Sequence, residues 1–217
     1  MYTIHDLYDL SHSKAAAYLN QFIYPWEALK GIKDMIIALG ETLGEEYTQI
    51  TPQVWVHHTA KIAPTAYLGA PCILGPATEV RHGAFIRGSA LVGENCVVGN
   101  SVELKNVILF DNVQVPHYNY VGDSILGYKA HMGAGSITSN VKSDKSLVVI
   151  HAQPPIETGI KKVGAMLGDY VEVGCNSVLN PGTIIGRNSS IYPLSSVRGV
   201  VPENSIYKTG GVIVDKD

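Results

Sequence analysis

The sequence lacks the features that mark several classes of protein. Its 217 residues contain only three cysteines, which form no metal-binding motif and leave one without a partner. No apolar run approaches the roughly 20 residues that span a bilayer, and residues 1–6 have neither the basic nor the apolar part of a secretion signal. The net charge is only −3, with both signs mixed. We therefore expect a cytoplasmic protein that binds neither nucleic acid nor membrane.

Aromatic residues are also scarce, at 8%, whereas apolar residues make up 46%. The core must therefore be filled mainly by Val, Ile and Leu. Large apolar residues recur at intervals of six at Val56, Ile62, Leu68, Leu74, Val80, Ile86, Val92, Val98, Leu104 and Phe110, and again at Leu167, Val173, Leu179, Ile185, Ile191 and Val197. A helix repeats at 3.6 and a half-buried strand at 2, so neither explains a period of six. A fixed hexapeptide period is typical of a parallel β-helix.

The spacing predicts the geometry of the coil. Each six-residue unit forms a short strand and a corner, so three units form one triangular coil of about 18 residues. The large apolar residue points inward, and the residue four positions later is small. These small residues are Ala60, Ala66, Cys72, Thr78, Ala84, Ala90, Cys96, Ser177, Thr183, Ser189 and Ser195. We therefore expect Cys72 and Cys96 to be buried and Cys175, nearer a corner, to be exposed.

Residues 1–50 do not follow the period and predict a short helical segment. Ser13 can cap a helix that runs to about Phe22, and Pro25 suits the first turn of a second helix that ends at Gly40 or Gly44. One face of this second helix is apolar, formed by Trp26, Leu29, Ile32, Ile36 and Leu39. We expect it to pack on the end or side of the coil, and a lid or a docking site for a partner is the alternative.

Two breaks interrupt the β-helix that we expect over residues 54–200. Steps of six from Phe110 reach Pro116 and Gly122, so residues 116–123 are predicted to leave the regular coil at the surface. The second break, at about 141–165, predicts an inserted arm. In it Leu147–Ile150 would pair with Ile160–Val163 around two prolines. Residues 201–217 are expected to cover the open end as a tail.

Arg87 and Lys105 form the first candidate site. They are 18 residues apart, so they are expected to stack on one outer face about 4.8 Å apart. Two cations at that distance repel by about 3 kcal/mol at an effective dielectric of about 20. A bound phosphate would remove this repulsion. The alternative is that Glu103 or solvent neutralises the two charges.

His117 is the second candidate, because it lies in the first break, beyond the two cations. An imidazole beside an anion site can act as a general base near neutral pH, although a lone histidine is more often structural. No Ser-His-Asp or Cys-His pair supplies a covalent nucleophile. A zinc site would need further histidines, and Gly122 stands at the position five after His117 where the trimeric carbonic anhydrases of this fold have one. We therefore expect no metal.

Three segments resemble a known family. They are Val98–Lys105 (VGNSVELK), Pro116–Asp123 (PHYNYVGD) and Gly133–Asn140 (GAGSITSN). Together with the repeats, over about 54–200, they resemble the acetyltransferase half of the bifunctional N-acetylglucosamine-1-phosphate uridylyltransferase/glucosamine-1-phosphate acetyltransferases, and related sugar-phosphate nucleotidylyltransferases. The resemblance implies a left-handed β-helix, acetyl-CoA as co-substrate, and a homotrimer with each active site between adjacent β-helices.

The resemblance also assigns roles to single residues. His117 matches the catalytic base, and Arg87 and Lys105 match the residues that hold the sugar phosphate. The remaining matches are Tyr120 and Lys162 to substrate contacts, and Ala134 and Asn140 to contacts with the acetyl and pantetheine parts of acetyl-CoA. His131 stands where the family has a substrate-contacting Asn, so the sugar pocket is expected to differ.

The sequence contains no nucleotidyltransferase domain, so no nucleotide transfer is expected. The predicted function is acetyl-CoA-dependent N-acetylation of an amino-sugar 1-phosphate. The alternative is a non-catalytic sugar-phosphate-binding or assembly module that partners a separate nucleotidyltransferase. The identity of the sugar, and the choice between an amine and a hydroxyl acceptor, stay open at this point.

Overall fold

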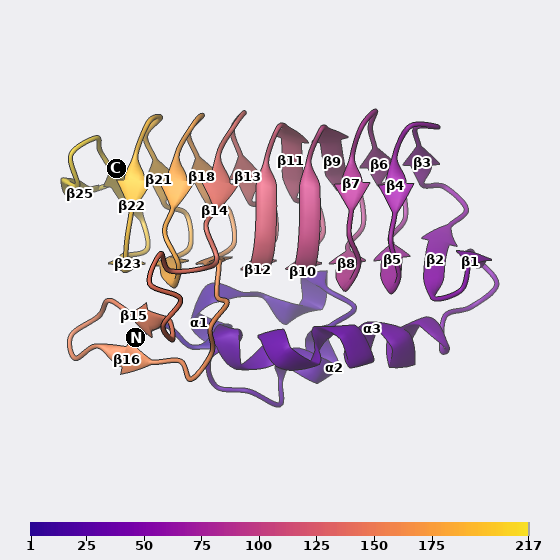
Figure 1. Cartoon of the computed structure of the whole chain (residues 1–217), viewed down its shortest axis with the longest axis horizontal. Coiled ribbons are helices and arrows are strands. Elements are labelled where there is room, and N and C mark those ends of the chain that lie inside the picture. Colours follow the sequence, from indigo (N-terminus) through magenta and orange to yellow (C-terminus); the bar gives the residue numbers. More distant parts are fainter. Residues whose placement is uncertain (217) are drawn as a thin grey trace.

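The computed structural model describes residues 1–216, which are mainly β-structure (Figure 1). Short parallel strands stack coil upon coil into a prism with three faces. The predicted left-handed parallel β-helix of hexapeptide repeats, with a short helical N-terminal segment, is confirmed. Within residues 1–216, no helix has the length and apolar character needed to cross a membrane.

Each face of the prism is a ladder of parallel strands. Face A consists of β2 (Val54–His57), β5 (Cys72–Leu74), β8 (Ala90–Val92), the second halves of β10 (Glu103–Leu109) and β12 (Tyr120–Leu126), β17 (Ala165–Leu167), β20 (Thr183–Ile185) and β23 (Val200–Val201). Face B consists of β3 (Lys61–Ile62), β6 (Glu79–Val80), β9 (Val97–Asn100), β11 (Gln114–His117), β13 (His131–Met132), β18 (Glu172–Val173), β21 (Ser190–Ile191) and β24 (Ser205–Tyr207). Face C consists of β4 (Tyr67–Leu68), β7 (Phe85–Ile86), the first halves of β10 and β12, β14 (Ile137–Thr138), β19 (Val178–Leu179) and β22 (Ser196–Val197).

Strand register shows where the hexapeptide period holds. Leu74 pairs with Val92 and Leu167 pairs with Ile185, each 18 residues further on. Most of the predicted inward residues are buried, as are the small residues four positions later, including Cys72 and Cys96. Cys175 is exposed, as predicted. In these coils the sequence period alone therefore places the core.

Two coils in the middle of the prism are one residue shorter, and here the prediction for Phe110 was wrong. Val92 pairs with Leu109, which therefore takes the inward position. Phe110 is buried instead beneath the ring of Tyr8, with the ring centroids 5.0 Å apart. The missing residue lies earlier, where Lys105–Asn106 replace a three-residue corner. A second residue is missing at Gly122–Asp123, since Leu109 pairs with Leu126. The last coil, in which Ile184 pairs with Val200, is two residues shorter.

The predicted surface departure at residues 116–123 was also wrong. This segment continues the coil through β11 and β12, with Val115 paired to Val98 and Val121 paired to Leu104. Only His117 and Tyr118 of the segment are exposed. A shortened corner changes the spacing of the inward residues, but the strands on either side of it stay paired. The break in the six-residue period therefore did not mean that the chain leaves the β-helix.

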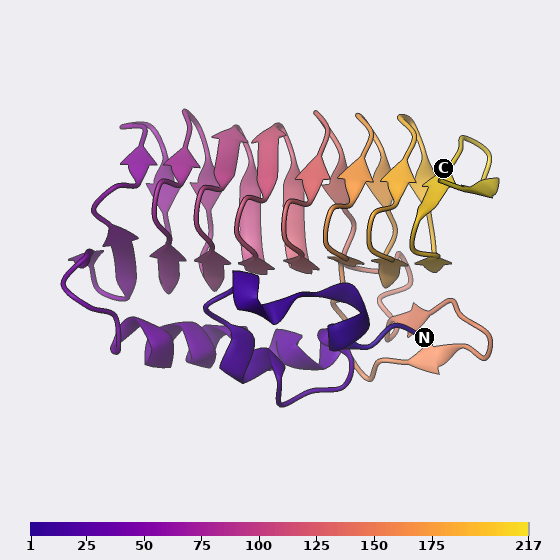
Figure 2. The same cartoon turned by 180° about the vertical axis from the view of Figure 1, so that it is seen from behind.

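The N-terminal segment lies along face A (Figures 1 and 2). It contains α1 (Ile4–Leu7), η1 (Leu10–His12), α2 (Ala16–Leu19), the 3-10 helix η2 (Pro25–Gly31) and α3 (Ile32–Gly40). The first predicted helix is therefore shorter than expected, because the Ser13 hydroxyl accepts from Ala15 N–H within a turn before α2 begins. The second begins at Pro25 and ends at Gly40, as predicted, but its first part is 3-10. The segment packs on the side of the prism, with the side chains of Trp26, Leu29, Ile32 and Ile36 buried.

The arm and the two ends complete the chain. The arm contains an antiparallel pair in which β15 (Val149–Ile150) pairs with β16 (Ile156–Glu157), which corrects the predicted strand partner. Of the predicted contact with Ile160–Val163, the bond from Val148 N–H to the Ile160 carbonyl is present at 2.8 Å. At the first end of the prism, β1 (Tyr47–Thr51) runs antiparallel to β2. At the last end, β25 (Ile213–Asp215) runs antiparallel to β24.

Candidate functional site

The candidate site lies where face C turns into face A, in the two shortened coils. Each shortened corner has only two residues, Lys105–Asn106 in one coil and Gly122–Asp123 in the next. Asn106 and Asp123 both have left-handed backbone, with φ of 56° and 48°. Asn and Asp tolerate this conformation better than other residues with a side chain. The turn therefore selects two short polar side chains, and these build the site.

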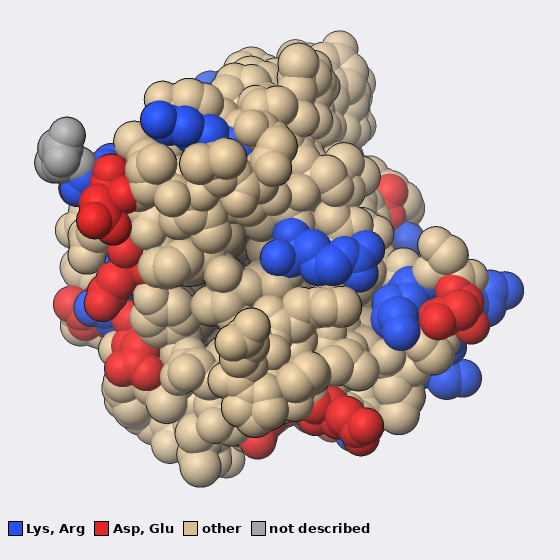
Figure 3. Space-filling view, turned by 90° about the vertical axis from the view of Figure 1, so that its left-hand side faces the viewer, with Lys and Arg blue, Asp and Glu red and all other residues tan. Residues whose placement is uncertain are grey.

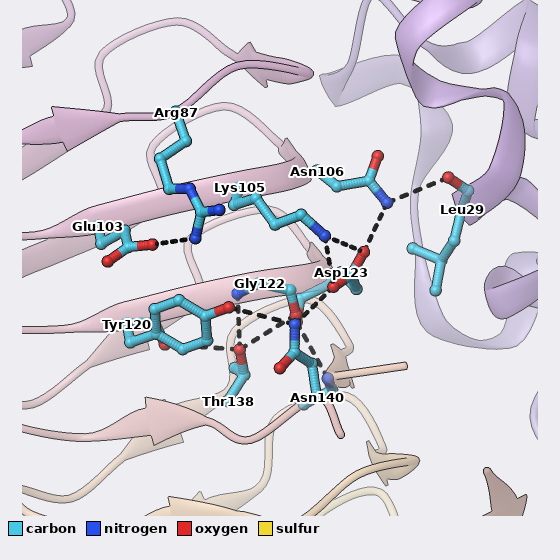
Figure 4. A network of polar contacts seen from close by, with 12 residues as sticks. Leu29, Arg87, Glu103, Lys105, Asn106, Tyr120, Gly122, Asp123, Thr138 and Asn140 are labelled. Carbon is cyan, nitrogen blue, oxygen red and sulfur yellow. Dashed lines mark hydrogen bonds and ion pairs between the residues drawn. The ribbon is translucent and has the colours of Figure 1, made fainter. Parts of the chain in front are cut away.

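Asp123 is the centre of a hydrogen-bond network (Figure 4). Its side chain is buried, and Lys105 Nζ donates to its two carboxylate oxygens at 3.1 and 3.0 Å. The amide nitrogens of Asn106 and Asn140 donate to it at 2.9 and 2.5 Å. A buried carboxylate is costly unless it is paired and hydrogen-bonded. These three donors therefore satisfy the Asp123 carboxylate, which in turn holds the Lys105 ammonium in place.

Arg87 and Lys105 are neighbours across the ladder, as their spacing predicted, because Ile86 pairs with Leu104. The structure nevertheless favours the alternative for their charges. Arg87 Nη1 lies 2.8 Å from Glu103 Oε1, and Lys105 pairs with Asp123. The hydrogen bond that Arg87 donates to Glu103 raises the pKa of Arg87 above its usual value. The expected repulsion is therefore already offset, and a phosphate would have to share these cations with carboxylates.

Tyr120 and Asn140 close the lower side of the network. Asn140 Nδ2 donates to the Tyr120 hydroxyl at 3.1 Å as well as to Asp123. Burial raises the pKa of Tyr120, so the phenol stays protonated at neutral pH. Gly122 lies between them, and a Cβ there would approach the Tyr120 hydroxyl oxygen to 2.5 Å. A side chain at this position would therefore displace the Tyr120 hydroxyl. One connected network joins Lys105, Asn106, Tyr120, Asp123 and Asn140.

His117 lies at the opposite edge of face C, where face B ends. It pairs with Asn100, and its side chain is exposed. Its carbonyl accepts from Gly135 N–H at 3.0 Å, and the register places Ala134 beside it in the next coil. Within residues 1–216 its ring has no hydrogen bond to the Asp123 network. A single chain therefore holds the candidate base and the candidate phosphate site at two edges of one face.

Neither His131 nor Lys162 joins the network in a single chain. His131 lies on face B, where its Nδ1 is 2.7 Å from Glu172 Oε2. Lys162 is exposed where the arm returns to the prism, between β16 and β17, and the following residue, Val163, donates from its N–H to the Asn140 carbonyl at 3.1 Å. The arm therefore touches the backbone of the site, whereas the Lys162 side chain points to solvent.

The end of the molecule that carries the last coils shows no field of one sign (Figure 3). Basic and acidic side chains alternate there, and on the arm Lys142 lies 3.5 Å from Asp144. In the part of the chain that is described, no three His, Cys, Asp or Glu side chains gather as they would around a metal ion.

Sequence reasoning missed the roles of Asp123 and Asn106. A signal was present, because Asp123 follows Lys105 by 18 residues and is therefore expected within reach of its amine. The signal was obscured by the lost residue, because Lys105 pairs with Gly122 instead and Asp123 lies at the turn of β12 from face C to face A.

Comparison with known proteins agrees with the fold. A family model described as the GMPPB C-terminal domain matches residues 70–184. A bifunctional protein GlmU of Methanococcus maripaludis is 33% identical over 114 residues, which are 52% of this chain and 28% of the relative. A bifunctional sugar-1-phosphate nucleotidylyltransferase/acetyltransferase of Sulfurisphaera tokodaii is 31% identical over 106 residues, 48% of this chain and 26% of the relative.

The match thus spans less than a third of the length of these relatives. Among solved structures, the polySia-specific acetyltransferase NeuO is similar with a TM-score of 0.47 and 12% identity, over 72% of this chain and 82% of that one. The predicted resemblance to the acetyltransferase part of the bifunctional proteins is confirmed. With more than half of its residues matched by the family model, the chain belongs to the family of the GMPPB C-terminal domain.

Proposed function

We propose that the protein is an acetyl-CoA-dependent N-acetyltransferase that acts on an amino-sugar 1-phosphate. The observation that carries this proposal is the pair Arg87 and Lys105, neighbours on face C beside Tyr120 and Asn140. One relative is named as a bifunctional sugar-1-phosphate nucleotidylyltransferase/acetyltransferase, which supports the same proposal.

The two cations would bind the phosphate in different ways. The Arg87 side chain is 48% exposed, so its planar fork can donate to two phosphate oxygens while it keeps Glu103. The Lys105 side chain is 25% exposed and held from below by Asp123, so its ammonium is presented as a fixed point charge. Tyr120 and Asn140 would then contact the sugar or the acetyl donor beside them.

The acyl transfer needs a base, an electrophile and a site for the oxyanion. His117 would accept a proton from the amine while the amine nitrogen bonds to the thioester carbonyl carbon. The carbon–sulfur bond then breaks, and the imidazolium returns the proton to the thiolate that leaves. Backbone N–H groups near Ala134 would stabilise the oxyanion. The base is expected to contribute about 10²–10⁴ to the rate.

We propose further that a homotrimer completes the site. His117 lies apart from the network in one chain, so a substrate held by Arg87 and Lys105 needs a base from a neighbouring copy or a path across face C. Face A is covered by the N-terminal segment. Faces B and C, with the edge that carries His117, are thus the surfaces left for a neighbouring copy.

A non-catalytic sugar-phosphate-binding or assembly module is the second candidate, with a separate nucleotidyltransferase as its partner. The observation that favours it is that both cations already have carboxylate partners, at 2.8 and 3.0 Å. Such a site can hold a sugar phosphate weakly without any chemistry at His117.

The test is thiol release from acetyl-CoA with glucosamine 1-phosphate, for the wild type and for His117→Ala. The matched control is His82→Ala, which removes another exposed histidine from the same edge of the prism, since Asn100 lies between His82 and His117. We expect release by the wild type and the control, and a loss of roughly 10²-fold or more in His117→Ala. Unchanged release in His117→Ala would refute the mechanism. Sugar-phosphate binding by calorimetry without acetyl-CoA binding would support the module.

A further inference from the structure

Asn106 connects the N-terminal segment to the candidate phosphate site. Its side-chain nitrogen donates to the Leu29 carbonyl at 3.1 Å and to Asp123 Oδ1 at 2.9 Å (Figure 4). Asp123 in turn accepts from Lys105. A path of three hydrogen bonds thus runs from η2 to the Lys105 ammonium.

Each member of this path is held in one place. Leu29 lies in η2 and is only 3% exposed, so its carbonyl moves only if the N-terminal segment moves. Asn106 has a left-handed backbone, which fixes the direction of its short side chain. Asp123 is 4% exposed, so water cannot readily replace a lost donor.

The path accounts for the orientation of the carboxylate. Asn140 and Lys105 both donate to Asp123 Oδ2, whereas Asn106 and Lys105 both donate to Oδ1. Without the Asn106 amide, Oδ1 keeps only the bond from Lys105, and the carboxylate can rotate about its bond to Cβ. The ammonium would then lose one of its two contacts and move into solvent more often.

We propose that Asn106 is a positioning residue, and that through it the N-terminal segment sets the affinity of the site for an anionic acceptor. This inference rests on the proposed function, in that Lys105 binds the phosphate. The helical segment is then part of the acceptor site as well as a cover for face A. Lys105 contacts the acceptor, while Asn106 acts only through Asp123.

The test compares Asn106→Gly with Asn188→Gly. Glycine accepts the left-handed backbone at both positions, so the amide is removed without backbone strain. Asn188 is a matched control because its φ is 60° and its amide also donates to the next coil, to Asn204 Oδ1 at 3.2 Å. The two readouts are the KM values for glucosamine 1-phosphate and for acetyl-CoA, and the rate of Lys105 acetylation by a small active ester, followed by mass spectrometry.

We expect Asn106→Gly to raise the KM for the sugar phosphate roughly tenfold and to leave the KM for acetyl-CoA within about twofold. Lys105 should react about threefold faster than in the wild type. Asn188→Gly should change neither quantity. If Asn106→Gly matches Asn188→Gly in both readouts, the amide is merely structural and the proposal is overturned.

A failure of the proposed function is distinguishable. If the wild type transfers no acetyl group to the sugar phosphate, the rate of Lys105 acetylation alone decides whether Asn106 positions the amine. A double-mutant cycle with Asp123→Asn provides the second check, because residues that act through one another are not additive. Additive effects of the two variants on that rate would also overturn the path.

Discussion

The regular coils and the two shortened coils use the same ladder for different purposes. In the regular coils, 18 residues close one turn, and small buried side chains such as Ala90 and Ser189 fill the corners. In each of the two shortened coils, one corner has two residues in place of three. The second residue of this corner is Asn106 in one coil and Asp123 in the next. The regular coils provide a scaffold, and in the shortened coils the loss of one corner residue brings Asn106 and Asp123 together in a polar site.

The same corner also carries the inserted arm. In the coil after the two shortened ones, the chain leaves face C after β14 and returns to face A at β17, so the arm occupies the corner next to Asn140. The corners between face C and face A thus differ in length from coil to coil, while the strands on either side of them stay paired. The predictions that follow test this division between scaffold and site.

The largest contrast concerns the thiols of the scaffold and the surface. Burial raises the pKa of both Cys72 and Cys96 to about 12, while Cys175 is exposed at a corner. Because only the thiolate reacts, the buried pair should react at least about 10³-fold more slowly than Cys175 at neutral pH. A thiol titration should count one fast group in the native protein and three in denaturant. Fast reaction of all three in the native state would show that the core opens readily.

A core truncation should separate stability from binding. Ile86 is fully buried in a regular coil, so Ile86→Ala should lower the free energy of unfolding by about 3 kcal/mol. Urea denaturation gives the value, and the outward-facing Val97→Ala on β9 serves as the control with an expected loss below about 1 kcal/mol. Equal losses in both variants would contradict the assigned inward direction.

An insertion should turn a shortened coil into a regular one. A glycine between Lys105 and Asn106 restores three residues to the corner, as in Arg87-Gly88-Ser89. We expect the protein to fold, and the affinity for glucosamine 1-phosphate to fall by roughly tenfold, because Lys105 and Asn106 no longer share Asp123. Calorimetry measures the affinity, with a glycine inserted between Gly210 and Gly211 as the control. Unchanged affinity would show that the shortened corner does not contribute to binding of the sugar phosphate.

The smallest effect concerns the start of the N-terminal segment. Thr3 N–H and hydroxyl donate to Asp6 at 2.7 Å each, and these bonds lower the pKa of Asp6. A depressed carboxylate pKa stabilises the fold above the ordinary value of about 3.8, and this stability is lost as the pH falls through the lower value. Since Asp6 is exposed, we expect Asp6→Asn to cost only about 0.5 kcal/mol at pH 6. Urea denaturation should show that the difference shrinks as the pH falls through the lowered pKa of Asp6, and a constant difference would exclude the charge as its cause.

The prism could be predicted from the sequence because each six-residue repeat places its own large apolar residue in the core. Val92 and Leu104 satisfy a local rule that does not depend on their neighbours, and sixteen repeats of the rule leave no other fold. The neighbour relation of Arg87 and Lys105 followed from the same period. His117 came first from its place in the register break, and the resemblance assigned it the role of base. All of these roles stay predictions, as do those that the resemblance alone assigned to Tyr120, Lys162, His131, Ala134 and Asn140.

What the sequence could not supply was the effect of a missing residue. The six-residue period showed that the register is two residues out of phase when it resumes at Leu126. It did not show that one residue is lost at Lys105–Asn106 and the other at Gly122–Asp123. Phe110 is a large apolar residue at the expected interval of six because it packs on Tyr8, so nothing in the sequence indicated the residue lost at Lys105–Asn106. The carboxylate partners of the two cations depend on rotamers and corner geometry, which a period does not encode.

The antiparallel strands β1 and β25 bear on how the molecule behaves at high concentration. A stack of parallel coils exposes unpaired backbone at both ends, which is a template for further copies to add and form fibres. On face A the first end is closed by β1, and on face B the last end is closed by β25, each running against the direction of the stack. A second copy that offered its own coil in parallel register would meet a strand of the wrong polarity at these edges. Two short terminal strands thus oppose end-to-end polymerisation of a fold that could otherwise continue without limit.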